Sequence, residues 1–182
     1  YLLLTEEDLF RWGPLAKIGP PLRTPEDNEA LWKGIVDGTI DVVASDHAPK
    51  AKGRTEDFFE APYGSPQAET LLPLMYDAGV NRGRITLPRL TQLLSETPAR
   101  IFGLYPRKGC LEVGSDADVV ILDPRLQHTL SGKKQHSRAG YTLYEGRECL
   151  GGPWMTLQRG RVVLDRGQLV AKPGDGLFIP LA

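Results

Sequence analysis

The feature that most constrains the fold is a strongly marked helix that runs directly into a short β-type segment. Thr24, followed by Pro25 and Asp27, has the composition of a helix start, and Gly38 has that of a helix end. The apolar residues between them share one stripe of the predicted helix: Leu31, Trp32, Ile35 and Val36. Because the segment IDVVA follows at once, the sequence predicts the helix–strand half of a β–α–β unit.

The β-type segment over residues 40–45 is expected to be a strand that is buried on both faces. Its residues form an almost continuous apolar run. Asp46 and His47 then fall where the chain leaves the predicted sheet, and α/β proteins commonly place their chemistry there.

Asp46 and His47 each allow a structural and a functional interpretation. An aspartate that follows a serine is most often a turn or helix-capping residue, and a lone histidine at a sheet edge is most often simply hydrogen-bonded. A carboxylate in this place can also bind a cation or metal and move protons. The two residues by themselves leave both interpretations open.

The rest of the chain changes character near residue 105. Residues 47–64 predict a long loop, and helices are predicted from Ser65 to about residue 75, from about Leu87 to Leu94 and from Thr97 to Gly103. After Tyr105, short β-rich runs alternate with glycine-containing pairs, which is the pattern of hairpins. We therefore predict one domain over residues 1–105 and a small β-rich domain over residues 106–182.

Composition excludes several classes of protein. An apolar fraction of 41% in 182 residues argues against disorder, and a net charge of −1 without a basic stripe argues against a nucleic-acid partner. Cys110 and Cys149 suit a reducing compartment, so a cytoplasmic location is predicted. No apolar run is long enough to cross a bilayer. The chain opens on YLLLTEEDL without methionine, and we interpret it as a fragment.

Several segments, in order along the chain, resemble the cyclic amidohydrolases, a family of hydantoinases, dihydropyrimidinases, allantoinases and dihydroorotases. They include PLR at 21–23, the run ending in ASDHAP at 44–49, ETLLPL at 69–74, ETPARIFGLYPRKG at 96–109 and LEVGSDADVVILDP at 111–124. The resemblance implies an α/β fold, namely the C-terminal part of a TIM-type (β/α)8 barrel followed by a small β-rich, sandwich-like domain.

The resemblance also implies a role for Asp46. In this family the aspartate of the SDHAP motif binds one of two divalent metals, with zinc expected, and acts as general base and acid. The implied reaction is hydrolytic opening of a cyclic amide or ureide, in which the carboxylate carries a proton from the attacking hydroxide to the leaving nitrogen. Asp46 is thus the expected catalytic residue and metal ligand.

The family's other metal ligands have no match in this sequence. They are an HxH pair, a lysine that is usually carboxylated and two further histidines, whereas the 3 histidines here are His47, His128 and His136. We expect His128 and His136 to lie in a polar loop of the second domain. Because one carboxylate does not hold zinc tightly, the isolated chain is expected to be an incomplete enzyme that binds no metal alone.

Substrate contacts are predicted at Gly19, Lys50, Tyr63 and Gly64. Gly19 occupies the position before PPLR where the family commonly has asparagine or serine, and Tyr63 occupies that of a hydantoinase asparagine. Lys50 is either a solvated charge or a contact to an acidic substrate group, and Gly64 either faces the ring or forms a plain turn.

The sequence leaves the choice of ring open. A hydantoinase-, dihydropyrimidinase- or allantoinase-like activity is the first expectation, and the alternatives are a dihydroorotase and a catalytically silent scaffold relative. The expected partners are a small cyclic amide and, in the complete protein, further copies of itself; neither nucleic acid nor a membrane is expected.

Overall fold

The computed structural model describes residues 1–180, which fall into two compact units that interleave along the chain. Unit 1 comprises Tyr1–Ile40, Ala44–Leu71 and Thr129–Cys149, and unit 2 comprises Asp41–Val43, Leu72–His128 and the residues from Leu150 onward. Neither unit has a boundary near residue 105. The division into residues 1–105 and 106–182 therefore stays a prediction.

Helix α2 of unit 1 begins and ends where the sequence predicts. Helix α1 (Asp8–Trp12) continues into the 3-10 turn η1 (Gly13–Ala16), and α2 spans Pro25–Asp37. At the start of α2 the Thr24 hydroxyl accepts the Asp27 N–H, the Asp27 carboxylate accepts the Thr24 N–H, and Gly38 ends the helix with a φ of 87°. The predicted stripe is narrower than expected, because Trp32 and Ile35 are buried whereas Val36 is 59% exposed.

Residues 40–45 do not form the predicted strand. Their backbone is extended without a β-ladder, and none of Ile40, Val42 and Val43 is fully buried, while Ala44 is exposed. The Ile40 N–H donates to the Gly34 carbonyl within unit 1, and the Val43 N–H donates to the Leu93 carbonyl within unit 2. A strand exists only where a neighbouring strand pairs with it, and no strand of the described residues does so here.

Residues 68–101 are more continuously helical than predicted. A 3-10 turn η2 (Ala68–Thr70) leads into α3 (Leu71–Met75) and the π-helical η3 (Tyr76–Asn81), so the helix starts at Ala68 rather than at Ser65. Pro73 is the third residue of α3, and the helical run continues past it to Asn81. Helix α4 (Leu87–Thr91), π-helical η4 (Gln92–Glu96) and α5 (Thr97–Ile101) follow one another without the predicted break.

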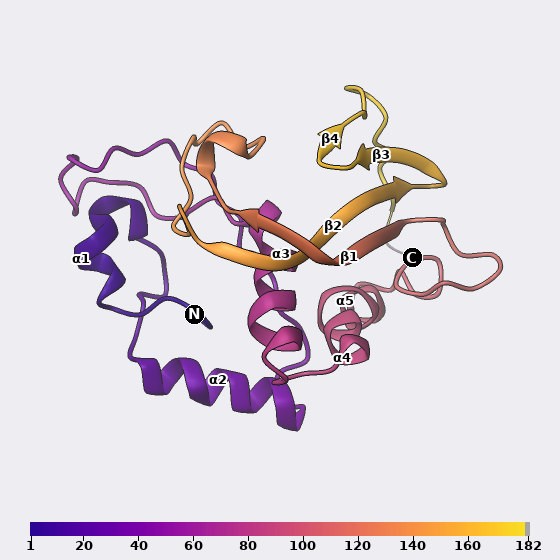
Figure 1. Cartoon of the computed structure of the whole chain (residues 1–182), viewed down its shortest axis with the longest axis horizontal. Helices are drawn as coiled ribbons and strands as arrows, with labels where there is room; N and C mark the ends of the chain where they lie inside the picture. The colour runs from indigo at the N-terminus through magenta and orange to yellow at the C-terminus, as the bar shows by residue number, and fades with distance from the viewer. Residues whose placement is uncertain (181–182) are drawn as a thin grey trace. The chain divides into compact units, whose positions relative to one another are not determined.

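The β-rich character of the later residues is confirmed. Strands β1 (Val119–Thr129), β2 (Glu148–Gln158), β3 (Arg161–Asp165) and β4 (Gln168–Leu169) form a four-stranded sheet in the order β1-β2-β3-β4 (Figure 1). The β2–β3 and β3–β4 pairs are antiparallel. A short 3-10 turn η5 (Gly132–Lys134) lies in the connection from β1 to β2. His128 is part of strand β1, so its prediction as a loop residue is wrong, whereas His136 does lie in a loop.

Glycine-containing pairs close both hairpins, as the sequence predicts. Arg159 and Gly160 join β2 to β3 with φ values of 48° and 76°, and Arg166 and Gly167 join β3 to β4 with 47° and 79°. Two successive residues with positive φ make the type I′ turn, whose twist matches that of antiparallel strands.

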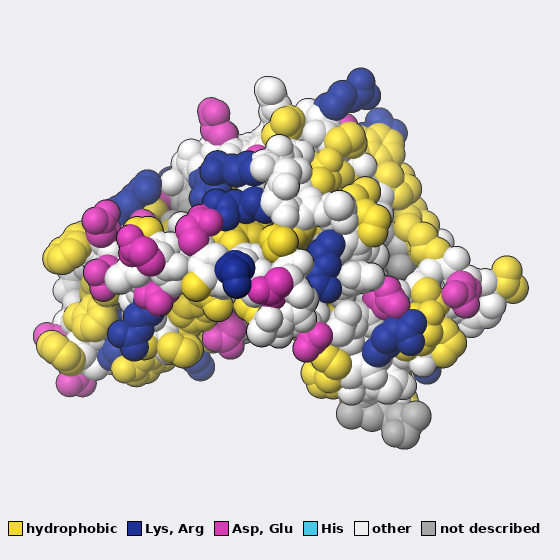
Figure 2. All heavy atoms as spheres, turned by 90° about the horizontal axis from the view of Figure 1, so that it is seen from below, with side chains coloured by type: hydrophobic (Ala, Val, Ile, Leu, Met, Phe, Trp, Pro, Cys, Tyr) yellow, Lys and Arg dark blue, Asp and Glu magenta, His cyan; other side chains and the backbone are white. Residues whose placement is uncertain are grey.

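Each unit has its own hydrophobic core. In unit 1 the deeply buried apolar side chains include Trp12, Leu15, Ala16, Leu22, Trp32, Ile35 and Leu143, and in unit 2 they include Leu74, Met75, Ala78, Leu90 and Leu93. On the face that Figure 2 draws, basic and acidic side chains are interspersed among hydrophobic ones. None of the helices in residues 1–180 has the length and apolar character that crossing a membrane requires. The fold is therefore α/β with a small antiparallel sheet.

Candidate functional site

Asp46 has an unusual backbone conformation for a residue with a side chain. Its φ is 45°, in the left-handed region of backbone conformation. The other described non-glycine residues with positive φ, Arg159 and Arg166, both lie in hairpin turns. Aspartate tolerates the left-handed region better than most residues, so a plain turn is one explanation, and functional sites are another place where such conformations are found. Among the described residues, the exposed Asp46 carboxylate makes no hydrogen bond or ion pair and is open to a ligand.

His47 anchors the chain directly after Asp46. Its Nδ1 accepts the backbone N–H groups of Gln67 and Ala68, each at 3.0 Å, and its backbone forms an isolated parallel bridge with Ser65. Those N–H groups lie at the start of the helical run that begins at Ala68. The first N–H groups of a helix have no acceptor within the helix, and the His47 ring supplies one. His47 is thus hydrogen-bonded, as its structural interpretation expects, although no sheet of the described residues lies here, and its two bonds hold the chain next to Asp46.

Gly64 lies against the segment that carries Asp46. A Cβ built on Gly64 would lie 2.7 Å from the Ala48 carbonyl oxygen, and the φ of Gly64 is +111°, so both space and backbone conformation require glycine. The Ala48 N–H donates to the Ser65 carbonyl at 3.1 Å, and the Gly64 N–H donates to the Lys17 carbonyl, also at 3.1 Å. Residues 46–48 and 64–65 therefore run side by side.

Gly19 and Tyr63 come together although 44 positions separate them in the printed sequence. A Cβ on Gly19 would lie 3.4 Å from Cδ1 of the Tyr63 ring, which is ordinary van der Waals contact. The Tyr63 side chain is 63% exposed, so its ring is available to a ligand. The structure thus brings Gly19, Tyr63 and Gly64 into one region of unit 1; their role as substrate contacts stays a prediction.

Lys50 has no side-chain contact among the described residues that would assign it a role. Its side chain is exposed, and its described contact is a backbone hydrogen bond from its N–H to the Ala48 carbonyl at 2.8 Å. The contact leaves both interpretations of Lys50, solvated charge or ligand contact, as predictions.

Sequence reasoning missed several residues of this region. The Tyr1 hydroxyl donates to the Pro20 carbonyl at 2.7 Å, and burial, followed by the negative charge of Asp46, raises the pKa of the Tyr1 phenol. The Lys52 ammonium donates to the Lys17 carbonyl, and burial, followed by the positive charge of Lys17, lowers the pKa of Lys52 to about 8. The one available signal was Lys17 itself, a lone charge in the apolar segment Leu15–Ile18.

The described residues do not make a metal site by themselves. Residues 1–180 contain no group of three or more histidine, cysteine, aspartate or glutamate side chains placed to hold a metal ion. His136 is paired instead with Glu69, with its Nδ1 at 2.9 Å from the carboxylate. Asp46 could supply one oxygen ligand, and a stable zinc site needs about three or four protein ligands.

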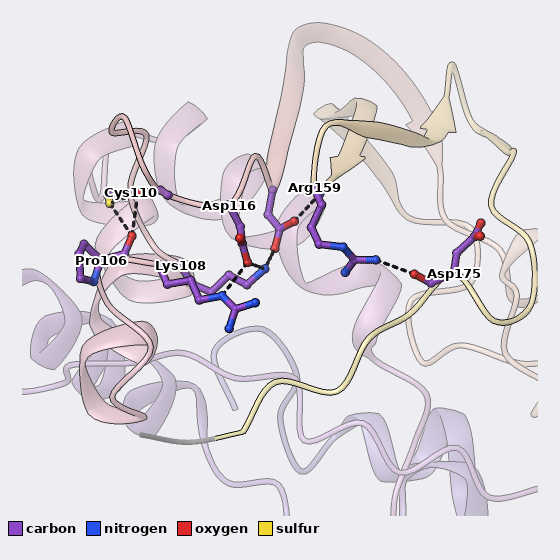
Figure 3. Close-up of polar contacts among 9 residues, drawn as sticks. Pro106, Lys108, Cys110, Asp116, Arg159 and Asp175 are labelled. Atoms are coloured by element: carbon purple, nitrogen blue, oxygen red, sulfur yellow. Dashed lines mark hydrogen bonds and ion pairs between the residues drawn. The ribbon is translucent and has the colours of Figure 1, made fainter.

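Asp116 and Asp118 are two carboxylates separated by one residue in the sequence, and their contacts are structural. Both carboxylates accept from the Lys108 ammonium, Asp116 also accepts from Arg107, and Asp118 accepts the Arg159 N–H at 2.8 Å (Figure 3). The Lys108 hydrogen bond is the main cause that lowers the pKa of Asp116. These contacts tie the turn before β1 to the β2–β3 hairpin within unit 2, as expected of turn residues.

The chain is similar to proteins of a known family. Residues 21–163 match the family model described as "Amidohydrolase family". An L-hydantoinase of Paenarthrobacter aurescens is 39% identical over 183 residues, which cover 98% of this chain and 40% of the relative. A D-hydantoinase of Bacillus sp. AR9 superposes with a TM-score of 0.93 at 36% identity, covering 98% of this chain and 41% of that one.

A dihydropyrimidinase of Brevibacillus agri NCHU1002 superposes with a TM-score of 0.88 at 32% identity, covering 93% of this chain and 39% of that one. The chain thus spans about 40% of the length of the relatives it matches.

Proposed function

Because the chain belongs to the amidohydrolase family, we propose that the protein containing it is a hydrolase that opens the ring of a cyclic amide or ureide. Its similarity to hydantoinases and a dihydropyrimidinase supports rings of the hydantoin and dihydropyrimidine type. Residues 1–105 would be the last strands and helices of a TIM-type barrel, and residues 106–182 a small β-rich domain. The antiparallel sheet supports the second part of this proposal.

Asp46 carries the proposal, because its exposed carboxylate makes no hydrogen bond or ion pair among the described residues and stands beside the segment with Tyr63 and Gly64. In the proposed reaction a water molecule adds to the ring carbonyl carbon, and the ring C–N bond breaks. The Asp46 carboxylate takes a proton from the attacking water and gives it to the leaving nitrogen, which regenerates the carboxylate. A divalent metal, for which zinc is expected, would need ligands besides Asp46, and when bound it would polarise the ring carbonyl.

The test is a substitution that removes the base and keeps the shape. In the complete protein, Asp46→Asn should lower kcat by about a hundredfold to ten-thousandfold, since an amide cannot carry the proton. Asp41→Asn, at another exposed aspartate of the same segment, is the matched control and should leave kcat unchanged. A wild-type rate in the Asp46→Asn enzyme, with the asparagine confirmed by mass spectrometry, would overturn the role of Asp46.

The substrate is identified with a panel of ring compounds. A hydantoin, a dihydropyrimidine, allantoin and dihydroorotate would be supplied to the wild-type protein, and ring opening would be followed by chromatography. We expect the hydantoin or the dihydropyrimidine to give the highest kcat/KM. Preference for dihydroorotate would support the dihydroorotase alternative, and no turnover of any ring by the metal-loaded complete protein would support the silent relative.

Metal binding and assembly belong to the same proposal. Elemental analysis of the 182-residue polypeptide after incubation with zinc should give much less than one metal per chain, because the described residues contain no group of three ligands. About two metals per chain would contradict this ligand census. Homo-oligomer formation by the complete protein remains a prediction that light scattering tests.

A further inference from the structure

Lys17 is buried where a charged side chain is rarely found. Lys17 comes directly after η1, in the apolar segment Leu15–Ile18, and is 7% exposed. A buried ammonium is costly unless hydrogen-bonding partners and charge-stabilising groups surround it. Its side chain is therefore expected to have specific contacts, and these contacts indicate what the residue does.

The Lys17 ammonium holds the loop of residues 58–63. Its Nζ donates to the Phe59 carbonyl at 2.6 Å and lies 4.7 Å from the centroid of the Tyr63 ring and 5.7 Å from that of the Phe58 ring. Both rings are within the range of cation–π attraction. A charge-assisted hydrogen bond and two aromatic faces together replace the water that this ammonium has lost.

The Lys17 main chain holds the same loop at two further points. Its carbonyl accepts the Gly64 N–H and the Lys52 ammonium, each at 3.1 Å. The bonds made by this one residue therefore reach the loop at residues 52, 59 and 64, and its charge lies over the ring of Tyr63.

The loop has other bonds as well, and they reach fewer parts of it than those of Lys17. The Asp57 carboxylate accepts the nearby N–H groups of Phe59 and Glu60, and the Tyr141 hydroxyl donates to the Gly64 carbonyl at 3.4 Å. Residues 48–64 contain no helix and no strand, so no ladder of backbone hydrogen bonds orders them. The alternative interpretation, a lysine whose stem merely covers apolar surface with its ammonium in water, does not fit a side chain that is 7% exposed and bonded to a carbonyl at 2.6 Å.

We propose that Lys17 is a positioning residue, which fixes the Tyr63 ring and the Gly64 backbone in the orientation that the ring substrate contacts. That a ring substrate binds here rests on the proposed function, whereas the ordering of the loop by Lys17 rests on the contacts alone. Loss of the ammonium would leave Tyr63 and Gly64 in place in the sequence but free to adopt other conformations.

The experiment compares Lys17→Met with Lys17→Arg in the complete protein, with Lys33→Met as the matched control. Lys33 lies on α2 with its side chain 83% exposed, so its loss should change neither the loop nor catalysis. One readout is hydrogen–deuterium exchange in peptides covering residues 58–65, with the β2–β3 hairpin as internal reference. The other is KM and kcat for the best ring compound of the panel.

We expect Lys17→Met to raise exchange in residues 58–65 and KM by about tenfold each, with kcat changed less than about threefold, because a binding surface is lost rather than a proton carrier. Lys17→Arg should restore part of both effects, since it keeps a charged donor. Unchanged exchange and unchanged KM in a folded Lys17→Met protein would overturn the proposal.

The two proposals fail in different ways. If the wild-type protein opens no ring, the proposed function fails, while the exchange readout still decides whether Lys17 orders the loop. If Lys17→Met does not fold, Phe58→Leu removes one of the two rings beside the ammonium at a partly exposed position. It should shift exchange in the same direction by about threefold, and no shift would overturn the positioning role.

Discussion

The β2–β3–β4 hairpins and the loop of residues 47–64 are ordered in different ways. The hairpins are held by backbone ladders and by turns whose residues stand next to each other in the sequence. The loop has no ladder; it combines local bonds, such as that of the Phe59 N–H to the Asp57 carboxylate, with contacts from far away in the sequence, such as Lys17 to Phe59 and Tyr141 to Gly64. The regular elements are thus specified by residues that are close in the sequence, whereas the candidate site also depends on long-range contacts.

The largest effect is expected from Gly64→Ala, which attacks the loop. The added methyl meets the Ala48 carbonyl at a φ of +111°, so the change should lower the free energy of unfolding by about 2–4 kcal/mol. Gly38→Ala is the control, because Gly38 also has positive φ, +87°, but nothing within 4 Å of an added Cβ. It should cost about 1–2 kcal/mol. Equal losses in urea titrations would mean that the Ala48 contact does not constrain the loop.

A smaller effect is expected from Thr24→Ala, which tests a locally encoded element. Loss of the hydroxyl that accepts the Asp27 N–H should lower the free energy of unfolding by about 1 kcal/mol. Thr24→Ser keeps the acceptor and should stay close to wild type in the same thermal or urea titration. If Thr24→Ser were as destabilised as Thr24→Ala, the capping hydrogen bond would not be the cause.

A pH effect is expected from Lys52, in the loop. The pKa of Lys52 is lowered from 10.5 to about 8 by burial and by Lys17, with Glu56 opposing the shift. Between these values the unfolded chain holds a proton that the folded chain has released, so stability should rise as pH increases through this window. Urea midpoints at about pH 7.5, 8.5 and 9.5 measure the rise, and Lys52→Met should reduce it. An identical pH dependence in both proteins would exclude Lys52 as its source.

The smallest effect is expected from Arg166→Asn in the β3–β4 hairpin. Asparagine followed by glycine suits a type I′ turn better than arginine followed by glycine, so stability should increase by about 0.5 kcal/mol. The change also removes an exposed ion pair with Asp165 and a contact over Trp154, which limits the gain. A thermal melt decides the sign, and a clear loss of stability would show that these contacts outweigh the turn.

The failure of the predicted strand at residues 40–45 shows where local reasoning ends. Val42 and Val43 have high β-propensity, yet propensity describes what a pleated surface accepts rather than whether such a surface is present. Among the described residues the Val43 N–H bonds to a helical carbonyl, that of Leu93, instead of a strand. The order of residues in the sequence contains no direct information about that partner.

The candidate site was predicted unevenly for the same reason. Asp46 was predicted from its motif, and the structure adds its positive φ and an exposed carboxylate, while its role stays a prediction. Lys17 was passed over because a lone lysine in an apolar segment is normally a solvated or snorkelling residue, and only its neighbours reveal otherwise. Likewise, nothing in the sequence indicates that Gly19 lies beside the Tyr63 ring.

By itself the sequence determined the elements whose signals are local: the capped helix from Thr24 to Gly38, the glycine-closed hairpins and the motif that contains Asp46. The tertiary structure was needed to show that residues 40–45 join no strand of the described residues and that Lys17 bonds to the loop of Tyr63 and Gly64. The physical reason is range. The hydrogen bonds of caps and turns are made by atoms a few residues away. A buried ammonium, or a β-type segment that could become a strand, needs partners that only the fold brings within reach.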